Sequence, residues 1–228
     1  TLQFVDVAGH IADAEVMIDL SHVKGHGSCG YGGACKNLAM GCVTDRTRQQ
    51  IHHLEGGLTW NENNCTHCEA CLRNCNYHAN KFNEDNKYQV NFHHCTYCQH
   101  CVKVCPTGAL VMNDQQYKDF QTGMAISTHE VLKTFAPGHV FYINFLINIT
   151  ALCDCWGFTT PSLVPDIGIL GSKDIVAIER ASLDAIRTED LILSGIPQGL
   201  ALGKKGHLFE RLHGKNPFVQ LEELEKRG

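Results

Sequence analysis

Two runs of cysteine constrain this chain more than any other feature. Both follow the spacing C-x-x-C-x-x-C-x-x-x-C, and their members are Cys65, Cys68, Cys71 and Cys75, then Cys95, Cys98, Cys101 and Cys105. Two residues between cysteines let a tight loop turn three thiolates toward one point, as a cubane iron–sulfur cluster requires. The fourth cysteine of such a run, set apart by three residues, usually reaches the other cluster.

We therefore expect two [4Fe-4S] clusters with crossed ligand sets. The first set would be Cys65, Cys68, Cys71 and Cys105, and the second Cys95, Cys98, Cys101 and Cys75. Structural zinc sites are one alternative, because C-x-x-C is also zinc spacing, but zinc normally takes two cysteines from each of two knuckles. Disulfides are another alternative, and the spacing gives no reason for them.

Residues 58–112 resemble a bacterial-type ferredoxin that carries two [4Fe-4S] clusters. The second run ends in Cys-Pro-Thr-Gly-Ala-Leu at residues 105–110, which is the usual ending in that family. The first run departs from the pattern, because Asn76 stands where proline is usual. Between the runs, a polar turn at 83–86 predicts a short hairpin.

Composition narrows the functional classes. The chain has 228 residues, of which 43% are hydrophobic, enough for one or two folded domains. A net charge of −5 argues against a nucleic-acid surface. The most apolar run, 140–152, is interrupted by Asn144 and Asn148, so we expect no membrane span. No signal peptide is visible, although the chain begins at Thr1 without a methionine.

Cysteine usage indicates a reducing compartment. The cysteines outside the two runs are odd in number: Cys29, Cys35, Cys42, Cys153 and Cys155. An unpaired set of this kind fits the cytoplasm better than a disulfide framework. Together with the cluster chemistry, it suggests anaerobic or low-oxygen metabolism.

Strand and helix patterns alternate on either side of the ferredoxin-like stretch, which predicts α/β layers. Expected strands are 2–7, 16–20 (buried), 140–149 and 164–171, and expected helices are 11–15, 34–40, 115–136, 175–186 and 217–226. Residues 44–57 indicate a solvated linker, and 204–215 a basic surface stretch. The predicted fold is an α/β host domain, a layered sheet with helices, from 1–57 and 113–228. An α+β dicluster ferredoxin-like module is inserted at 58–112.

A glycine-rich loop at 30–33 separates a polar segment from the helix expected at 34–40. Such a loop can present backbone N–H groups to an anion. The spacing is neither a Walker nor a dinucleotide fingerprint, so a tight turn against the sheet is the favoured interpretation. The candidate residues for a small anionic ligand are His22, Lys24, His26 and Lys36.

Cys153 and Cys155 are separated by one residue and follow an expected strand. With Cys42, which ends the glycine-rich segment, and with His22 or His26, they would form a third metal or cluster site. The alternative is that they are small, buried, inert thiols.

Several longer stretches resemble the domain of unknown function 362 (DUF362) family of iron–sulfur proteins. They are Ser21–His26, Gly30–Gly33 with Lys36–Cys42, Cys153–Gly157 and Pro165–Leu170. Members of that family often contain an inserted ferredoxin domain. Its members carry more α/β sequence upstream, so we expect residues 1–57 and 113–228 to be the C-terminal part of a longer host domain. Cys29 and Cys35 depart from the pattern, and Glu179 replaces a usual aspartate.

A shorter similarity is to the lactate-racemase-like fold. Its members carry a histidine, a glycine-rich loop and a lysine that holds a cofactor, which would be His26, Gly30–Gly33 and Lys36 here.

These features favour an electron-transfer protein that relays single electrons through two [4Fe-4S] clusters between redox partner proteins. The alternative is a cluster-fed oxidoreductase that acts on a small anionic substrate in the host domain, so whether the chain is an enzyme stays open. A third interpretation is a docking subunit of a larger oxidoreductase, and an oligomer is compatible with all three. A screen for anion binding separates the second from the first.

Overall fold

The computed structural model describes residues 2–91, 94–95, 100–112, 117–157, 159–198 and 200–228. Within them the chain has a mixed α/β architecture, as the alternating patterns predict. The largest sheet has three strands in the order β1-β8-β9. Strand β1 (Met17–His22) runs parallel to β8 (Val140–Leu146), which is antiparallel to β9 (Gly168–Ser172).

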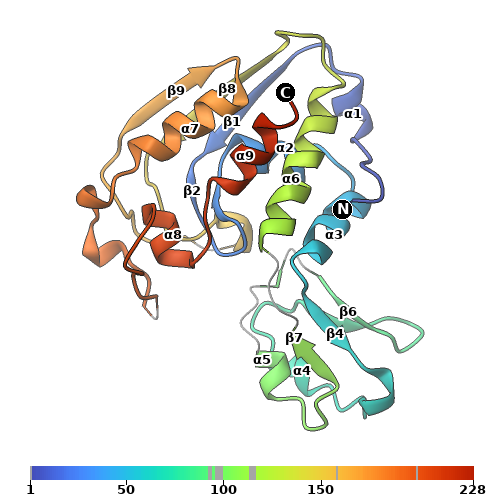
Figure 1. Ribbon diagram of the computed structural model, residues 1–228. Coiled ribbons are helices and arrows are strands. Elements are labelled where there is room, and N and C mark those ends of the chain that lie inside the picture. The colour runs from blue at the N-terminus through green and yellow to red at the C-terminus, as the bar shows by residue number, and fades with distance from the viewer. Residues whose placement is uncertain (1, 92–93, 96–99, 113–116, 158, 199) are drawn as a thin grey trace.

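Helices cover one face of this sheet (Figure 1). They are α2 (Ala34–Gly41), α6 (Tyr117–Leu132), α7 (Ile175–Ala185) and α9 (Val219–Glu225). Helix α2 packs against β1, α7 packs against β8 and β9, and α6 lies between α2 and α9. The side chain of Asp174 caps α7 by accepting a hydrogen bond from the N–H of Ala177 at 2.9 Å.

The core lies between the sheet and these helices. Leu38 of α2 and Phe120 and Met124 of α6 are fully buried in one cluster. Leu146 and Leu183 are buried in a second cluster, beside the C-terminal part of the chain. Strand β8 alternates buried and less buried positions, because successive side chains point to opposite faces.

The opposite face of the sheet carries exposed apolar side chains. Ile18 is 62% exposed, Leu20 58% and Ile169 60%. The prediction that 16–20 is a buried strand is therefore wrong for three of its five residues, Val16, Ile18 and Leu20, which are exposed. The helices that pack on the sheet lie over the side of Asp19 and Ser21, which are buried instead.

The first part of the chain differs from its predicted elements. Residues 2–7 form no strand and make only a bridge from Val7 to Val43. Helix α1 covers Gly9–Ala12. The expected linker contains a helix, α3 (Asp45–Leu54), which packs against α6 and buries Thr47 and Ile51. These two residues are four positions apart and lie on one face of the helix. Because their neighbours are polar, the sequence shows no clear apolar stripe here.

Two more small elements shape the later sites. Strands β2 (Lys24–His26) and β3 (Gly30–Gly32) form a buried antiparallel hairpin. The basic stretch at 204–215 is only partly surface, because it contains α8 (Leu208–His213), which buries Leu208 and Phe209. Short 3-10 turns are η1 (Glu62–Asn64), η2 (Asp154–Trp156), η3 (Thr188–Asp190) and η4 (Leu193–Gly195).

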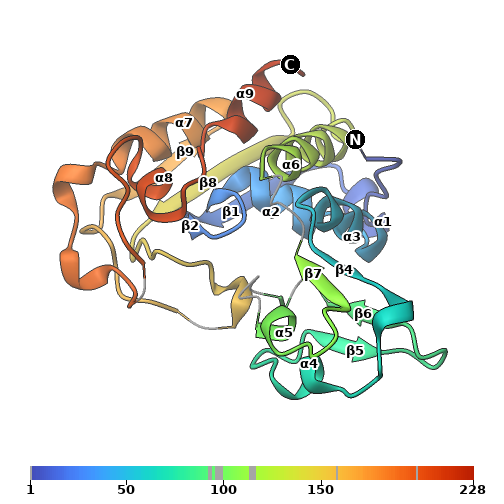
Figure 2. The same cartoon turned by 60° about the horizontal axis from the view of Figure 1, so that its bottom comes forward.

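The elements that carry the cysteine runs gather beyond α3 (Figures 1 and 2). Strands β4 (Leu58–Trp60) and β7 (Leu110–Met112) pair and bring the two ends of this stretch together. Strands β5 (Asn80–Phe82) and β6 (Tyr88–Val90) form the predicted hairpin. Helices α4 (Ala70–Arg73) and α5 (His100–Lys103) contact each other.

Candidate functional site

Cysteines from both runs line one pocket beside β4 and β7. Cys65, Cys68 and Cys71 come from the first run, and Cys105 is the last member of the second. This is the four-residue set expected for the first cluster. Cys75, the fourth member of the first run, is not among the lining residues.

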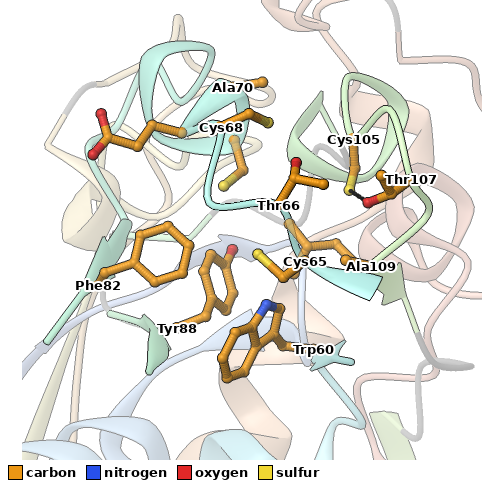
Figure 3. Close-up of a pocket in the computed structure, with 13 residues that line it drawn as sticks. Trp60, Cys65, Thr66, Cys68, Ala70, Phe82, Tyr88, Cys105, Thr107 and Ala109 are labelled. Carbon is orange, nitrogen blue, oxygen red and sulfur yellow. Dashed lines mark hydrogen bonds between the residues drawn. The ribbon is translucent and has the colours of Figure 1, made fainter. Parts of the chain in front are cut away.

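Aromatic rings close one side of this pocket (Figure 3). The ring centroids of Trp60 and Phe82 lie 6.2 Å apart, and those of Phe82 and Tyr88 lie 5.8 Å apart. The Nε1 atom of Trp60 is buried and has no hydrogen-bond partner among the described residues. It is a donor in the wall of a sulfur-lined pocket, where an acceptor sulfur would satisfy it.

The pKa values of two thiols in this pocket are shifted in opposite directions. Burial raises the pKa of Cys71 to about 11, and the neighbouring Cys101 and Cys105 add to this. Burial also raises the pKa of Cys105, but the N–H groups of Leu110, Thr107 and Ala109 lower it more, so its net pKa lies below the ordinary value. The Thr107 hydroxyl contributes, with Oγ1 3.8 Å from Sγ (Figure 3).

Three members of the second predicted set, Cys75, Cys95 and Cys101, lie near Tyr88. Burial raises the pKa of the Tyr88 hydroxyl, and negative charge on Cys101, Cys71, Cys95 and Cys75 raises it further. Tyr88 therefore lies near thiols of both predicted sets. Cys75 accepts a hydrogen bond from the N–H of Ala79, 3.3 Å from its Sγ. Cys98 lies outside the described residues.

A second group of possible ligands forms where the 150–155 segment meets β2. A Cβ atom on Gly25 would lie 2.2 Å from the carbonyl oxygen of Ala151, so the two backbones can approach only because position 25 is glycine. The N–H of Gly25 donates to the carbonyl of Thr150 at 2.8 Å. The His213 ring donates from Nε2 to the carbonyl of Ala151 at 2.8 Å.

This contact brings Cys153 and Cys155 beside His26. The ligand atoms of these three residues all lie within 4.8 Å of one another, and Nε2 of His26 is 3.6 Å from Sγ of Cys155. Cys153 is the N-cap of the 3-10 turn η2 and Cys155 lies within that turn, rather than at the strand end expected from the sequence. Cys42 is not part of this group, because it ends α2 and packs against the first core cluster.

The charge around this group is positive. Burial alone would lower the pKa of Lys36, but negative charge on Cys153 and Cys155 raises it above its ordinary value. A hydrogen bond with Cys155 lowers the pKa of Cys153 to about 6, and Lys36 and Lys24 contribute to the decrease. The ammonium of Lys24 is buried and forms an ion pair with Asp154.

A cavity of about 260 Å³ adjoins these residues. Its lining includes three of the four residues predicted to hold a small anion, namely His22, Lys24 and Lys36, together with Cys153. The fourth, His26, is 3% exposed and does not line the cavity. The Nε2 atom of His22 is 2.7 Å from the carbonyl oxygen of Ile147, so this ring is already held in place.

The glycine loop does not offer its helix end to a ligand. The buried carboxylate of Glu179 accepts hydrogen bonds from the N–H of Ala34 at 2.8 Å and from the hydroxyl of Tyr31. A Cβ atom on Gly33 would lie 2.4 Å from Oε1 of Glu179. The first turn of α2 is thus satisfied inside the protein, which agrees with the favoured interpretation of the loop as a tight turn.

The family description "Domain of unknown function (DUF362)" matches residues 1–184. The chain belongs to the DUF362 family. No curated protein and no solved structure matches it. As a DUF362 chain it is rich in cysteine and contains a group with metal-ligand geometry. Among the described residues, no helix is long and apolar enough to cross a lipid bilayer.

Several residues of these sites escape sequence reasoning. Trp60 precedes and Tyr88 follows the first cysteine run, and both line its pocket. Their aromatic side chains were the only signal in the sequence for a role in the pocket wall. Asp154 stands between the two cysteines of η2, which is a local signal for a charged partner. Glu179 was noticeable only as a departure from the DUF362 pattern, and its contact with α2 depends on tertiary packing.

Proposed function

We propose that this protein is an electron carrier that relays single electrons through two [4Fe-4S] clusters. Residues 58–112 would be a ferredoxin-like module inserted into an α/β host domain formed by 1–57 and 113–228. The observation that supports this most is that Cys105 lines the pocket of Cys65, Cys68 and Cys71. A fourth thiol from the other run is what crossed ligation requires.

The pocket suits a sulfur-rich group in two further respects. Its wall contains the buried Nε1 donor of Trp60, which has no other partner among the described residues. N–H groups near Cys105 favour its thiolate form, and cluster ligation needs thiolates. Hydrogen bonds to sulfur and local burial are also the means by which a protein sets a cluster's potential.

The second set would be Cys95, Cys98, Cys101 and Cys75. Cys95 and Cys101 are buried, and both lie near the Tyr88 hydroxyl together with Cys75. When bound, each cluster supplies a one-electron redox couple. Tyr88 and the surrounding rings would exclude water between the two sets, and donor and acceptor proteins of the cytoplasm would dock at the surface nearby.

Chemical analysis of anaerobically purified protein tests this function. We expect brown protein with about eight irons and eight acid-labile sulfides per chain. Reduction with dithionite should give the electron paramagnetic resonance spectrum of two interacting reduced clusters. Zinc in place of iron, or the absence of sulfide, would overturn the proposal.

A second candidate function is supported by the cavity beside α2. Its lining by Lys24, Lys36 and His22 suits a small carboxylate or phosphate, on which a cluster-fed oxidoreductase would act. A thermal-shift screen with such anions should show stabilisation that Lys36→Met removes and that Lys173→Met, at an exposed position, retains. No shift with any anion would exclude this function.

A further inference from the structure

A sulfur–nitrogen ligand group in the host part of the chain is separate from both cysteine runs. It consists of Nε2 of His26 and the Sγ atoms of Cys153 and Cys155. These atoms lie within 4.8 Å of one another, close enough to surround one ion after small side-chain rotations. All three come from backbone that is held in place, because Gly25 allows β2 to contact Ala151 directly.

We propose that His26, Cys153 and Cys155 bind a single zinc-class divalent ion whose fourth coordination position opens toward the cavity beside Lys36. Two thiolates and one imidazole are a ligand set that zinc uses at sites that keep one position open. Cys153 belongs both to the ligand group and to the cavity lining, so the open position would face the cavity.

The surrounding charges agree with such an ion. Two thiolates would neutralise a divalent cation, which leaves Lys36 as a positive charge beside the open position. Asp154, the acidic residue between the two cysteines, is already paired with Lys24. The net positive charge would attract water or an anionic group to the fourth position.

To bind a metal through Nε2, the His26 ring has to carry its proton on Nδ1 instead of Nε2. The N–H of Ser28 donates to Nδ1 at 3.1 Å, which places the ring proton on Nε2. A metal on Nε2 needs that proton on Nδ1, so binding would exchange the Ser28 contact for the metal bond and turn the Ser28 peptide. Ser28 lies in the turn between β2 and β3, where a peptide can rotate without breaking a strand pair.

Zinc analysis of the whole, anaerobically prepared chain tests the proposal, with iron and sulfide determined on the same sample. After incubation with Zn²⁺ and gel filtration, we expect one zinc per chain. Zinc X-ray absorption should show two sulfurs at about 2.3 Å and nitrogen or oxygen at about 2.0–2.1 Å. Iron does not interfere at the zinc edge, and this measurement needs no variant.

Variants then assign the ligands. Cys153→Ser and Cys155→Ser should each lower zinc affinity by more than about 100-fold in competition with a chromophoric chelator, more than the loss of an outer-shell partner costs. Cys42→Ser should bind zinc like the wild type, because Cys42 lies outside the group.

Three results would overturn the proposal: no retained zinc, a zinc signal with four sulfurs, or equal affinity in the Cys155→Ser and wild-type proteins. Four sulfurs would place zinc in the cysteine runs and would count against the clusters as well. Because all three ligands lie outside the runs, loss of this site alone leaves the electron-carrier proposal intact.

Discussion

The Glu179 carboxylate accepts a hydrogen bond from the backbone N–H of Ala34, with Oε1 and N 2.8 Å apart. Glu179 lies on α7 and Ala34 begins α2, so a buried side chain of one helix satisfies the first turn of the other. Asn144 of β8 also donates to Oε1, at 3.1 Å. This carboxylate therefore joins two helices and the central strand.

Replacing Glu179 by alanine should destabilise the fold by about 3 kcal/mol, because it leaves the buried donors of Tyr31, Ala34 and Asn144 without their acceptor. Urea unfolding at pH 7 measures the change. Glu222→Ala, at an exposed position of α9, should stay within about 0.5 kcal/mol of the wild type. A loss below about 1 kcal/mol at Glu179 would contradict this role.

Gly33 precedes α2 and Gly41 is its last residue. Replacing each of them by alanine compares a crowded position with an open one. An added Cβ at Gly33 would lie 2.4 Å from Oε1 of Glu179, whereas one at Gly41 would meet nothing within 4 Å. We expect Gly33→Ala to cost about 1–3 kcal/mol through overpacking. Gly41→Ala should be neutral or stabilise the helix by up to about 1 kcal/mol. Thermal or urea unfolding measures the stability of both variants. Equal changes in the free energy of unfolding would argue against close packing between position 33 and Glu179.

Paired double variants test the crossing of the cysteine runs. If ligation is crossed, Cys65→Ala/Cys105→Ala removes two ligands from one cluster and keeps about four irons. Cys65→Ala/Cys75→Ala then damages both clusters and loses nearly all iron. Iron and sulfide per chain, measured anaerobically, separate the cases, because uncrossed ligation predicts the reverse order.

His213 should make stability depend on pH. Burial lowers the pKa of its ring to about 4 in the folded chain, against about 6.5 when unfolded. The unfolded state therefore binds a proton first, and stability that is fully present above pH 6.5 is lost as pH falls toward 4. Between pH 7 and 5 this amounts to about 2 kcal/mol.

The measurement for His213 is the difference in urea unfolding free energy between pH 7 and pH 5. His213→Gln keeps a donor for the carbonyl of Ala151 but cannot be protonated, so its pH dependence should be flatter by that amount. His129→Gln, on α6, serves as the control. An unchanged slope in His213→Gln would show that other groups cause the acid loss.

Local patterns were enough to predict most elements around the sheet. The apolar spacing of α6 and α7 and the run that forms β8 gave their types and nearly their bounds. Helix α3 was missed because its buried face holds only a few residues, such as Ile51, among many polar ones. The exposure of Ile18 and Leu20 could not be read from strand character, which does not say which face a helix layer will cover.

The candidate sites also divide into features that local sequence patterns predict and features that depend on tertiary packing. The spacing of the cysteines predicts Cys65, Cys68, Cys71 and Cys105 as one ligand set, and these four residues line one pocket, with Cys105 contributed by the other run. The grouping of His26 with Cys153 and Cys155 depends on Gly25 meeting Ala151, a contact between distant segments. Pattern reasoning placed Cys42 with these cysteines and had no means of choosing between His22 and His26, whereas the structure groups them with His26 and without Cys42.

The position of Cys105 also bears on biosynthesis. A nascent chain that ends before residue 105 has only three of the four thiols of the first pocket, and β4 still lacks its partner β7. The last thiol and the closing strand leave the ribosome almost together. With the proposed ligand sets, assembly of the first cluster would await translation of Cys105, whereas a chain that ends between Cys101 and Cys105 would already hold every thiol of the second set.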